Sequence, residues 1–200
     1  LRNAQQLFAD QWNRQQPDPR SERDLAKFYN DSDLEIFDLM YYHSAKWREG
    51  PLNYVCALDL ARRLGCRTYL DYGSGVGSGG LLFAREGYAV TLCDISTPLL
   101  DFATWRFAQR GLSATFIDLK SACPPEPVDL MTCFEVLEHV PDPLALLRQL
   151  RTYLRDGGWL VVSAPFGEDE EHPMHVVHDR RLIRRFRGQG FRHAWNLKAP

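Results

Sequence analysis

The stretch Tyr69–Gly80, YLDYGSGVGSGG, holds five glycines in twelve residues and directly follows an apolar run. Glycine loses more conformational freedom on folding than any other residue, so such a cluster destabilises a fold unless the backbone must turn sharply or approach a ligand closely. Gly73, Gly75 and Gly77 stand between a predicted strand and a predicted helix. We therefore expect the main chain here to form part of a ligand-binding site.

Strand and helix patterns alternate on both sides of this glycine loop. The predicted strands are residues 66–73, 88–96, 113–119, 128–136, 158–165 and 191–197, and the predicted helices between them are 78–87, 97–111, 141–158 and 179–190. This alternation is typical of crossover units around a parallel sheet with helices on both faces. The sequence thus predicts an α/β fold with a doubly wound, mostly parallel sheet, in which ligands bind at the carboxyl ends of the strands.

The first fifty residues differ from the rest. Residues 1–20 are rich in Gln, Asn, Arg and Pro and are predicted to be a loosely held arm, and residues 21–50 are helical, with Ser21 at a helix start. Pro51 opens the next helix and Gly65 ends it. We predict an arm and helical lid over 1–50 and a cofactor-binding domain over 51–200. The aromatic residues of the lid either cover an acceptor or pack as core.

The composition limits the partners. The net charge is −2, 44% of residues are hydrophobic, and no apolar stretch is long enough to span a bilayer. We therefore expect neither a membrane protein nor strong electrostatic binding to nucleic acid. The five cysteines form no CxxC pair, which favours reduced thiols and a cytoplasmic location. The sequence indicates no oligomeric state.

Two cofactor classes fit a glycine loop in this position. Gly75-x-Gly77-x-x-Gly80 matches the GxGxxG fingerprint of dinucleotide-binding enzymes. The same stretch, read as an acidic residue at Asp71 followed by GxGxG, resembles the first motif of the class I S-adenosylmethionine-dependent methyltransferase family. Four later features resemble that family in the same order: Asp94 at the end of the second predicted strand, Asp118 at the end of the third, VDLMTCFEVLEHVPDP at 128–143 and LRDGGWLVVSAP at 154–165. The resemblance extends from Pro51 to Pro165 and implies a Rossmann-like methyltransferase fold.

The resemblance also implies the cofactor, S-adenosylmethionine, and a role for each motif. Asp94 would accept hydrogen bonds from the ribose hydroxyls, Asp118 would contact the adenine, and Asp71 would orient the loop or face the ammonium group. From the residues alone, Asp94 can equally cap a helix, Asp118 can be a turn residue and Phe134 can belong to the core. The residues expected to bind the cofactor are Asp71, Gly73, Ser74, Gly75, Gly77, Asp94, Ile95, Asp118, Leu119 and Phe134.

A second informative stretch, FEVLEHVPDP at 134–143, begins in the last residues of the fourth predicted strand and continues beyond it. Glu135, Glu138 and His139 have i, i+3, i+4 spacing and would share one face of a helical turn. Two neighbouring carboxylates need neutralising, which a divalent cation would do with His139 as a nitrogen ligand. The stretch resembles ubiquinone-pathway O-methyltransferases and small-RNA 3′-end 2′-O-methyltransferases. The latter add a histidine after the fifth strand, and His175 is the matching residue here.

This resemblance implies a divalent metal held by Glu135, Glu138, His139 and His175. In a metal-free enzyme, Glu138 and His139 would shape the pocket, and His139 or His175 would act as the general base. Many methyltransferases with the same stretch bind no metal, so both versions remain open.

The predicted function is transfer of a methyl group from S-adenosylmethionine to an oxygen or nitrogen of a small-molecule acceptor. One alternative is a metal-dependent RNA 3′-end 2′-O-methyltransferase, with the arginines of residues 180–187 on phosphates. Others are an NAD-dependent oxidoreductase and a partner subunit without a cofactor. We favour a small molecule over RNA, because the chain as a whole is not basic. The family sheet usually ends with two strands after the last helix, whereas only 191–197 remain here.

Overall fold

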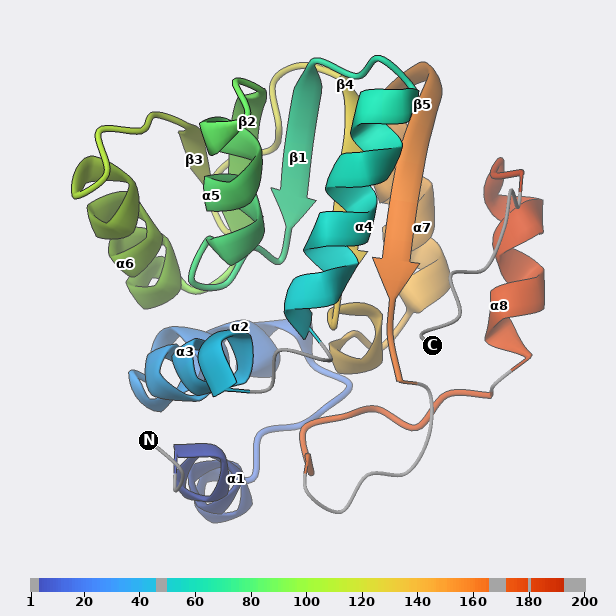
Figure 1. Ribbon diagram of the computed structural model, residues 1–200. Coiled ribbons are helices and arrows are strands. Elements are labelled where there is room, and N and C mark those ends of the chain that lie inside the picture. The colour runs from blue at the N-terminus through green and yellow to red at the C-terminus, as the bar shows by residue number, and fades with distance from the viewer. Residues whose placement is uncertain (1–3, 46–49, 166–171, 180, 193–200) are drawn as a thin grey trace.

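The computed structural model describes residues 4–45, 50–165, 172–179 and 181–192 and has a five-stranded sheet at its centre (Figure 1). The strands are β1 (Thr68–Tyr72), β2 (Ala89–Asp94), β3 (Thr115–Asp118), β4 (Val128–Phe134) and β5 (Leu154–Ser163). Every neighbouring pair is parallel. All seven residues of β4 are buried, as expected for a strand covered on both faces. The prediction of a doubly wound, parallel α/β sheet is confirmed.

The strand order is β3-β2-β1-β4-β5, so the direction of winding reverses beside β1. From β1 the chain moves outward through β2 to β3, and then returns to the other side of β1 to form β4. The loops that leave β1 and β4 therefore run to opposite sides. In open α/β sheets this reversal leaves a crevice at the carboxyl ends of the two strands.

Helices cover both faces of the sheet (Figure 1). One face packs against α4 (Gly50–Arg63), α5 (Ser78–Arg85) and α6 (Thr97–Ala108), with Phe83 of α5 stacked on Tyr69 at 3.6 Å between ring centroids. The other face packs against α7 (Pro143–Thr152), and α8 (Leu182–Arg185) and η2 (Phe186–Gln189) follow β5 in the chain. None of the helices in the described part of the chain is both long and apolar enough to cross a membrane.

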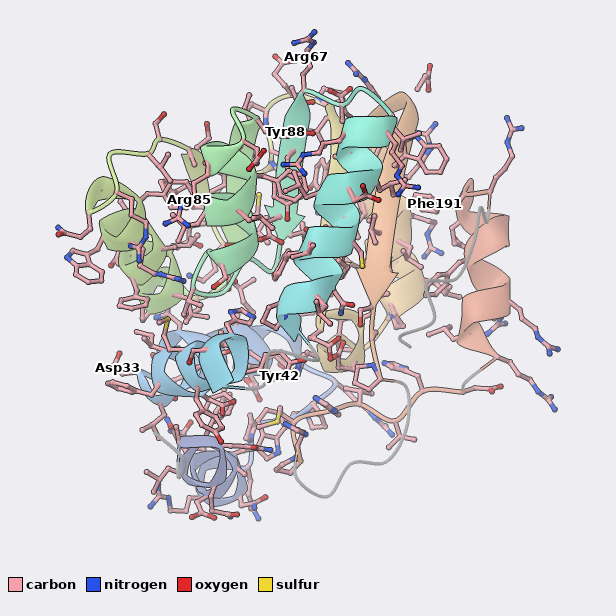
Figure 2. All side chains as sticks on the ribbon, in the orientation of Figure 1. Asp33, Tyr42, Arg67, Arg85, Tyr88 and Phe191 are labelled. Atoms are coloured by element: carbon pink, nitrogen blue, oxygen red, sulfur yellow. The ribbon has the colours of Figure 1, made fainter. Side chains whose placement is uncertain are left out.

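Three helices form a layer beneath the carboxyl ends of the strands, which we call the helical lid (Figure 1). They are α1 (Ala4–Gln15), α2 (Glu22–Asn30) and α3 (Leu34–Ala45). In Figure 2, Tyr42 of α3 lies where the lid meets the sheet, and Arg67 lies at the opposite end of the sheet. Ser21 caps α2 by accepting a hydrogen bond from the backbone N–H of Asp24, as predicted.

The prediction of a loosely held arm over residues 1–20 is wrong for α1. Phe8 and Trp12 are buried in the core of the lid, and the Trp12 ring meets Phe28 edge-on at 4.9 Å. These two residues are four positions apart and so share one face of the helix. Polar residues on the other face of the helix make the average composition of residues 1–20 polar, so the composition did not reveal the buried apolar face.

Two element boundaries also differ from the prediction. The helix predicted over 141–158 ends at Thr152, and β5 already begins at Leu154, because Leu154 pairs with Val128 of β4. The helical pattern of the sequence continues to Gly157 and Gly158, but pairing with β4 takes these residues into the sheet instead. Of the strand predicted over 191–197, Phe191 and Arg192 lie outside any strand, and 193–197 lie outside the described residues.

The packing of α1 predicts that Trp12→Ala destabilises the lid. Removing a buried tryptophan side chain costs about 3 kcal/mol, so we expect amide hydrogen exchange in α1 and α2 to accelerate roughly 100-fold. The control is Leu7→Ala, since Leu7 lies on the same helix with 48% of its surface exposed. Equal exchange rates in the two variants would show that α1 does not hold the lid together.

Candidate functional site

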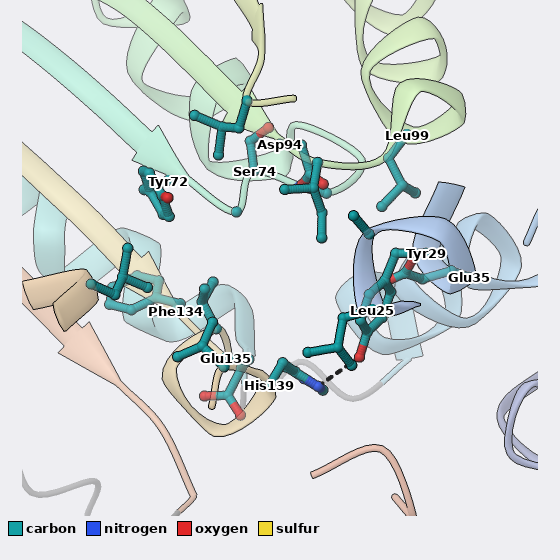
Figure 3. Close-up of a pocket in the computed structure, with 18 of the residues that line it drawn as sticks. Leu25, Tyr29, Glu35, Tyr72, Ser74, Asp94, Leu99, Phe134, Glu135 and His139 are labelled. Atoms are coloured by element: carbon teal, nitrogen blue, oxygen red, sulfur yellow. Dashed lines mark hydrogen bonds between the residues drawn. The ribbon is translucent and has the colours of Figure 1, made fainter. Parts of the chain in front are cut away.

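A cavity of about 600 Å³ lies between the carboxyl ends of the strands and the helical lid (Figure 3). Its size is that of ordinary small-molecule sites. Its wall comes from the ends of β1, β2, β3 and β4, from α2, α3 and α4, and from the start of α7. The cavity therefore occupies the crevice that the reversal of strand order predicts.

The glycine loop forms one wall of this cavity. Gly73, Gly75 and Gly77 have φ values of 73°, 50° and 74°, a region that favours glycine. A Cβ atom on Gly73 would lie 2.2 Å from the Val136 side chain, so no larger residue fits between the two loops. Gly77 does not line the cavity; a Cβ there would lie 2.9 Å from Ala103 of α6, so this glycine serves packing.

Asp94, at the end of β2, connects this loop to the cavity. Its two carboxylate oxygens accept hydrogen bonds from the backbone N–H groups of Gly75 at 2.7 Å and Ser96 at 2.9 Å. Asp94 is 7% exposed and lines the cavity (Figure 3). Burial raises the pKa of its carboxyl group, and the backbone hydrogen bonds oppose that shift. Each oxygen keeps a further lone pair for a ligand.

Asp71 faces away from the cavity. It is fully buried, and its Oδ1 accepts a hydrogen bond from Thr132 Oγ1 at 2.8 Å. A Cβ atom on Gly79 would lie 2.6 Å from Asp71 Oδ2, which places this oxygen beside the first turn of α5. Of the two predicted roles of Asp71, its position favours orienting the loop. Burial raises its pKa to about 7, and the Thr132 hydrogen bond opposes the shift.

The other predicted cofactor residues divide into two groups. Ser74, Ile95, Leu119 and Phe134 line the cavity together with Gly73, Gly75 and Asp94. Asp118 does not line it; its carboxylate accepts a hydrogen bond from Thr97 Oγ1 at 2.8 Å and pairs with Lys120 at 2.9 Å. The contact predicted between Asp118 and an adenine stays a prediction.

The backbone is strained at the residue that follows β4, where the chain reaches the cavity. Glu135 has a φ of 53°, which costs free energy in a residue with a side chain and tends to persist at functional sites. Its side chain lines the cavity and accepts a hydrogen bond from Ser163 Oγ at 2.7 Å. A single 3₁₀ turn, η1 (Leu137–His139), follows.

Glu138, in this turn, is fully buried, and neither of its carboxyl oxygens receives a hydrogen bond from the described residues. Burial and the neighbouring Glu135 charge raise the pKa of Glu138 to about 9. At neutral pH its carboxyl group is therefore protonated unless a cation lies beside it.

Three of the four predicted metal ligands come together. One side-chain atom from each of Glu138, His139 and His175 lies within 4.8 Å of the others, whereas Glu135 is not part of this group. His175 reaches it from the segment after β5, which is anchored by a hydrogen bond from Val176 N–H to the Glu138 carbonyl oxygen at 2.7 Å. Only His139 of the three also lines the cavity. Burial lowers its pKa to about 3, so the ring is neutral.

The sequence did not assign the residues that the lid contributes to the site. Tyr29 lines the cavity and shares a 2.7 Å hydrogen bond with His139 Nδ1 (Figure 3). Glu35, Leu39 and His43 of α3 line it as well. From the sequence, Tyr29 was considered only as one of the aromatic residues of the lid, which cover an acceptor or pack as core. No local pattern marks these side chains, because they face the cavity only once the lid has packed against the sheet.

Comparison with known proteins identifies the family. A family model described as a methyltransferase domain matches residues 49–197. The chain belongs to this family. The matched segment contains the glycine loop, Asp94 and the turn that carries His139. The methyltransferase resemblance predicted from the sequence motifs is confirmed.

Named relatives of this methyltransferase domain include ubiquinone biosynthesis O-methyltransferases. The chain is 36% identical over 121 residues to that of Actinobacillus pleuropneumoniae serotype 5b (strain L20), which covers 56% of this chain and 52% of the relative. It is 34% identical over 137 residues to that of Vibrio cholerae serotype O1 (strain ATCC 39541 / Classical Ogawa 395 / O395). That match covers 66% of this chain and 55% of the relative. The chain spans about half the length of the curated relatives it matches.

Solved structures agree on the fold. The crystal structure of magnesium protoporphyrin IX methyltransferase from Synechocystis PCC 6803 with bound SAM superposes with a TM-score of 0.68 and 19% identity. The match covers 87% of this chain and 88% of that one. At this identity the likeness shows the fold alone, a Rossmann-like methyltransferase fold.

The buried state of Asp71 predicts a pH-dependent stability. The unfolded chain releases the Asp71 proton near pH 4, whereas the folded chain keeps it until about pH 7. Protonated Asp71 therefore favours folding at low pH. This contribution falls progressively from about pH 4 and is gone once the pH has risen through 7. Between pH 4 and 8 the wild type should lose about 4 kcal/mol more unfolding free energy than Asp71→Asn. Urea unfolding across this range measures the difference.

The control for this measurement is Asp101→Asn, which removes an exposed carboxylate of α6. Its unfolding free energy should follow that of the wild type at every pH. Parallel curves for the wild type and Asp71→Asn would contradict the raised pKa.

Proposed function

We propose that this protein is an S-adenosylmethionine-dependent methyltransferase that transfers a methyl group to an oxygen or nitrogen of a small-molecule acceptor. The observation that carries the proposal is the Asp94 carboxylate. It is buried and held by two backbone N–H groups, and it faces a cavity walled by the glycine loop. The family match and the O-methyltransferase relatives support the same reaction.

The residues of the cavity fit this cofactor. Asp94 can accept the two hydroxyl hydrogens of a ribose, and a charged acceptor strengthens both bonds. Gly73 and Gly75 line the cavity with main chain alone, so the methionine part can lie directly against the backbone. A side chain at either position would collide with Val136 or Leu39. When bound, S-adenosylmethionine supplies a methyl group on a positively charged sulfur.

The protein then contributes position and exclusion of water. Phe134 is 8% exposed, lines the cavity at the end of β4 and packs edge-on against Tyr54 of α4 at 5.0 Å. The lid closes the opposite side with Tyr29 and Leu25 (Figure 3). Holding two reactants in line can supply about 7–11 kcal/mol of the barrier to a displacement reaction.

The cavity wall between α2 and α7 suits an acceptor with an apolar body. Leu25, Val140 and Leu146 line this part, next to the polar side chains of Arg23 and Gln149. A cavity of this size between the strand ends and the lid favours a small molecule over an RNA end. We also propose a cytoplasmic location, which the five free cysteines support.

We further propose a divalent cation site at Glu138, His139 and His175. Glu138 is the strongest support, because a buried carboxyl group whose oxygens receive no hydrogen bond requires either a proton or a cation. Two imidazoles and a carboxylate are a ligand set typical of catalytic zinc. Such a cation would lower the pKa of an acceptor hydroxyl near His139.

The metal-free alternative assigns proton acceptance to His139 or His175. His139 touches the cavity, but a pKa of about 3 makes it a weak proton acceptor at neutral pH. His175 does not line the cavity. The positions of the two rings thus favour ligand roles over a general base.

The cofactor proposal predicts the outcome of calorimetric titrations. We expect heat with S-adenosylmethionine and S-adenosylhomocysteine and none with NAD. Asp94→Asn should raise both dissociation constants roughly 10- to 100-fold, since it removes a charged acceptor of two hydrogen bonds. Asp101→Asn, which removes a carboxylate remote from the cavity, should leave them unchanged. Heat with NAD alone would overturn the proposal.

The cation proposal predicts that chelator-treated protein takes up one Zn²⁺ per chain, measured by elemental analysis after dialysis. Glu138→Gln should weaken this binding at least about tenfold, because the buried carboxylate is lost as a ligand. Glu135→Gln is the matched control and should retain the metal, since Glu135 lies outside the cluster. Equal uptake by the wild type and Glu138→Gln would exclude this site.

A further inference from the structure

The lid carries a carboxylate that the proposed mechanism leaves unused. Glu35, near the start of α3, lines the cavity, and its Oε2 is buried with no hydrogen-bond partner among the described residues. A buried carboxylate oxygen without a donor is costly and is rarely left so without a reason. Because Glu35 lines the cavity, a ligand bound there can donate the hydrogen bond that this oxygen lacks.

The surroundings of Glu35 identify where that ligand group lies. Glu35 and Asp94 both line the cavity, and Leu39, one turn after Glu35, lies against Gly75, whose N–H bonds to Asp94. Glu35 thus presents a second carboxylate to the same end of the cavity. Burial raises the pKa of Glu35, and the Asp94 and Asp38 charges raise it further. In Figure 3, Glu35 lies beside Tyr29 on the lid side, and Asp94 lies on the sheet side.

Among the described residues, no cationic side chain pairs with Glu35. Lys120 lines the cavity, but it pairs with Asp118 at 2.9 Å and also contacts the Ile95 carbonyl oxygen. Arg23 lines the cavity too, but among the described residues it forms no ion pair with Glu35, and Glu35 Oε2 has no hydrogen-bond partner. Two facing carboxylates repel each other, so the pair favours a ligand that offers donors to both.

A vicinal diol meets this requirement with two O–H donors on adjacent carbons and no charge to remove from water. The residues around Glu35 point to the sugar as this diol. Leu39, one turn after Glu35, lies against Gly75, and the Gly75 N–H bonds to Asp94, the carboxylate proposed to hold the ribose.

We propose that Glu35 is a further cofactor-binding residue, which accepts a hydrogen bond from a ribose hydroxyl on the lid side while Asp94 accepts on the sheet side. This inference rests on the proposed function. Leu39, one turn after Glu35, shares its face of α3 and packs toward the glycine loop, since a Cβ on Gly75 would lie 2.8 Å from Leu39 Cδ1. A bound nucleoside would thus contact both α3 and the sheet and hold them together.

The test is a titration of the full chain with S-adenosylhomocysteine, comparing the wild type with Glu35→Gln. The amide keeps the size of the side chain but removes its charge, so we expect the dissociation constant to rise about tenfold. Asp101→Asn is the control for one lost charge and should bind as the wild type does. Unchanged affinity in Glu35→Gln, with a wild type that binds, would overturn the role of Glu35 alone.

A second ligand shows whether the effect passes through the sugar. With the 2′,3′-dideoxy analogue of S-adenosylhomocysteine, wild type and Glu35→Gln should bind equally, because the hydroxyl partners are missing. A tenfold difference that persists with this analogue would overturn the ribose assignment. A wild type that binds neither compound would overturn both this inference and the proposed function.

Thermal unfolding separates ligand binding from a structural role. Without ligand, Glu35→Gln should melt at the same temperature as the wild type or higher, because it loses a carboxylate that faces Asp94. With saturating S-adenosylhomocysteine, its gain in melting temperature should be smaller than that of the wild type. A lower melting temperature without ligand would instead show that Glu35 stabilises the lid.

Discussion

The site depends on the hydrogen bonds that hold the Asp94 carboxylate between two backbone N–H groups. The bond from Gly75 ties the loop after β1 to the end of β2, and the bond from Ser96 ties the same carboxylate to the start of α6. One side chain thereby sets the relative position of two strand ends and a helix. Because its oxygens are oriented before any ligand arrives, little conformational entropy is lost when a ligand binds.

Buried acidic groups concentrate at this edge of the sheet. The pKa values of Asp71, Asp94, Glu35 and Glu138 are all raised by burial. Backbone N–H groups bond to both oxygens of Asp94, and a hydroxyl bonds to one oxygen of Asp71. The other oxygen of Asp71, one oxygen of Glu35 and both oxygens of Glu138 have no donor among the described residues. This edge of the fold is therefore suited to ligands that bring donors or positive charge, which is what an S-adenosylmethionine site requires.

The sequence predicted those parts of the site that depend on local chain geometry. The glycine loop, Asp94 and the 135–139 turn each sit next to a strand end, and the order of strands and helices places strand ends on one edge. Predictions failed where a local pattern competed with distant partners. The pairing of Leu154 with Val128 shortened a predicted helix, and the burial of Trp12 turned a predicted arm into a packed helix.

The expected cluster of Glu135, Glu138 and His139 shows the same limit. The i, i+3, i+4 spacing assumes a regular helical turn, but Glu135 adopts a positive φ before a 3₁₀ turn and bonds to Ser163 of β5. His175 belongs to a distant segment of the chain, which a hydrogen bond between Val176 and Glu138 joins to this turn.

The sequence alone determined the family, the order of elements and the residues at the strand ends, because glycine conformation, hydrophobic periodicity and motif order act over short stretches of chain. Only the tertiary structure decided which side chains of the lid reach the cavity, where Glu135 and Asp71 point, and that Glu35 lies near Asp94. Those relations join segments dozens of residues apart, and they are set by the packing of the lid against the sheet rather than by any local pattern.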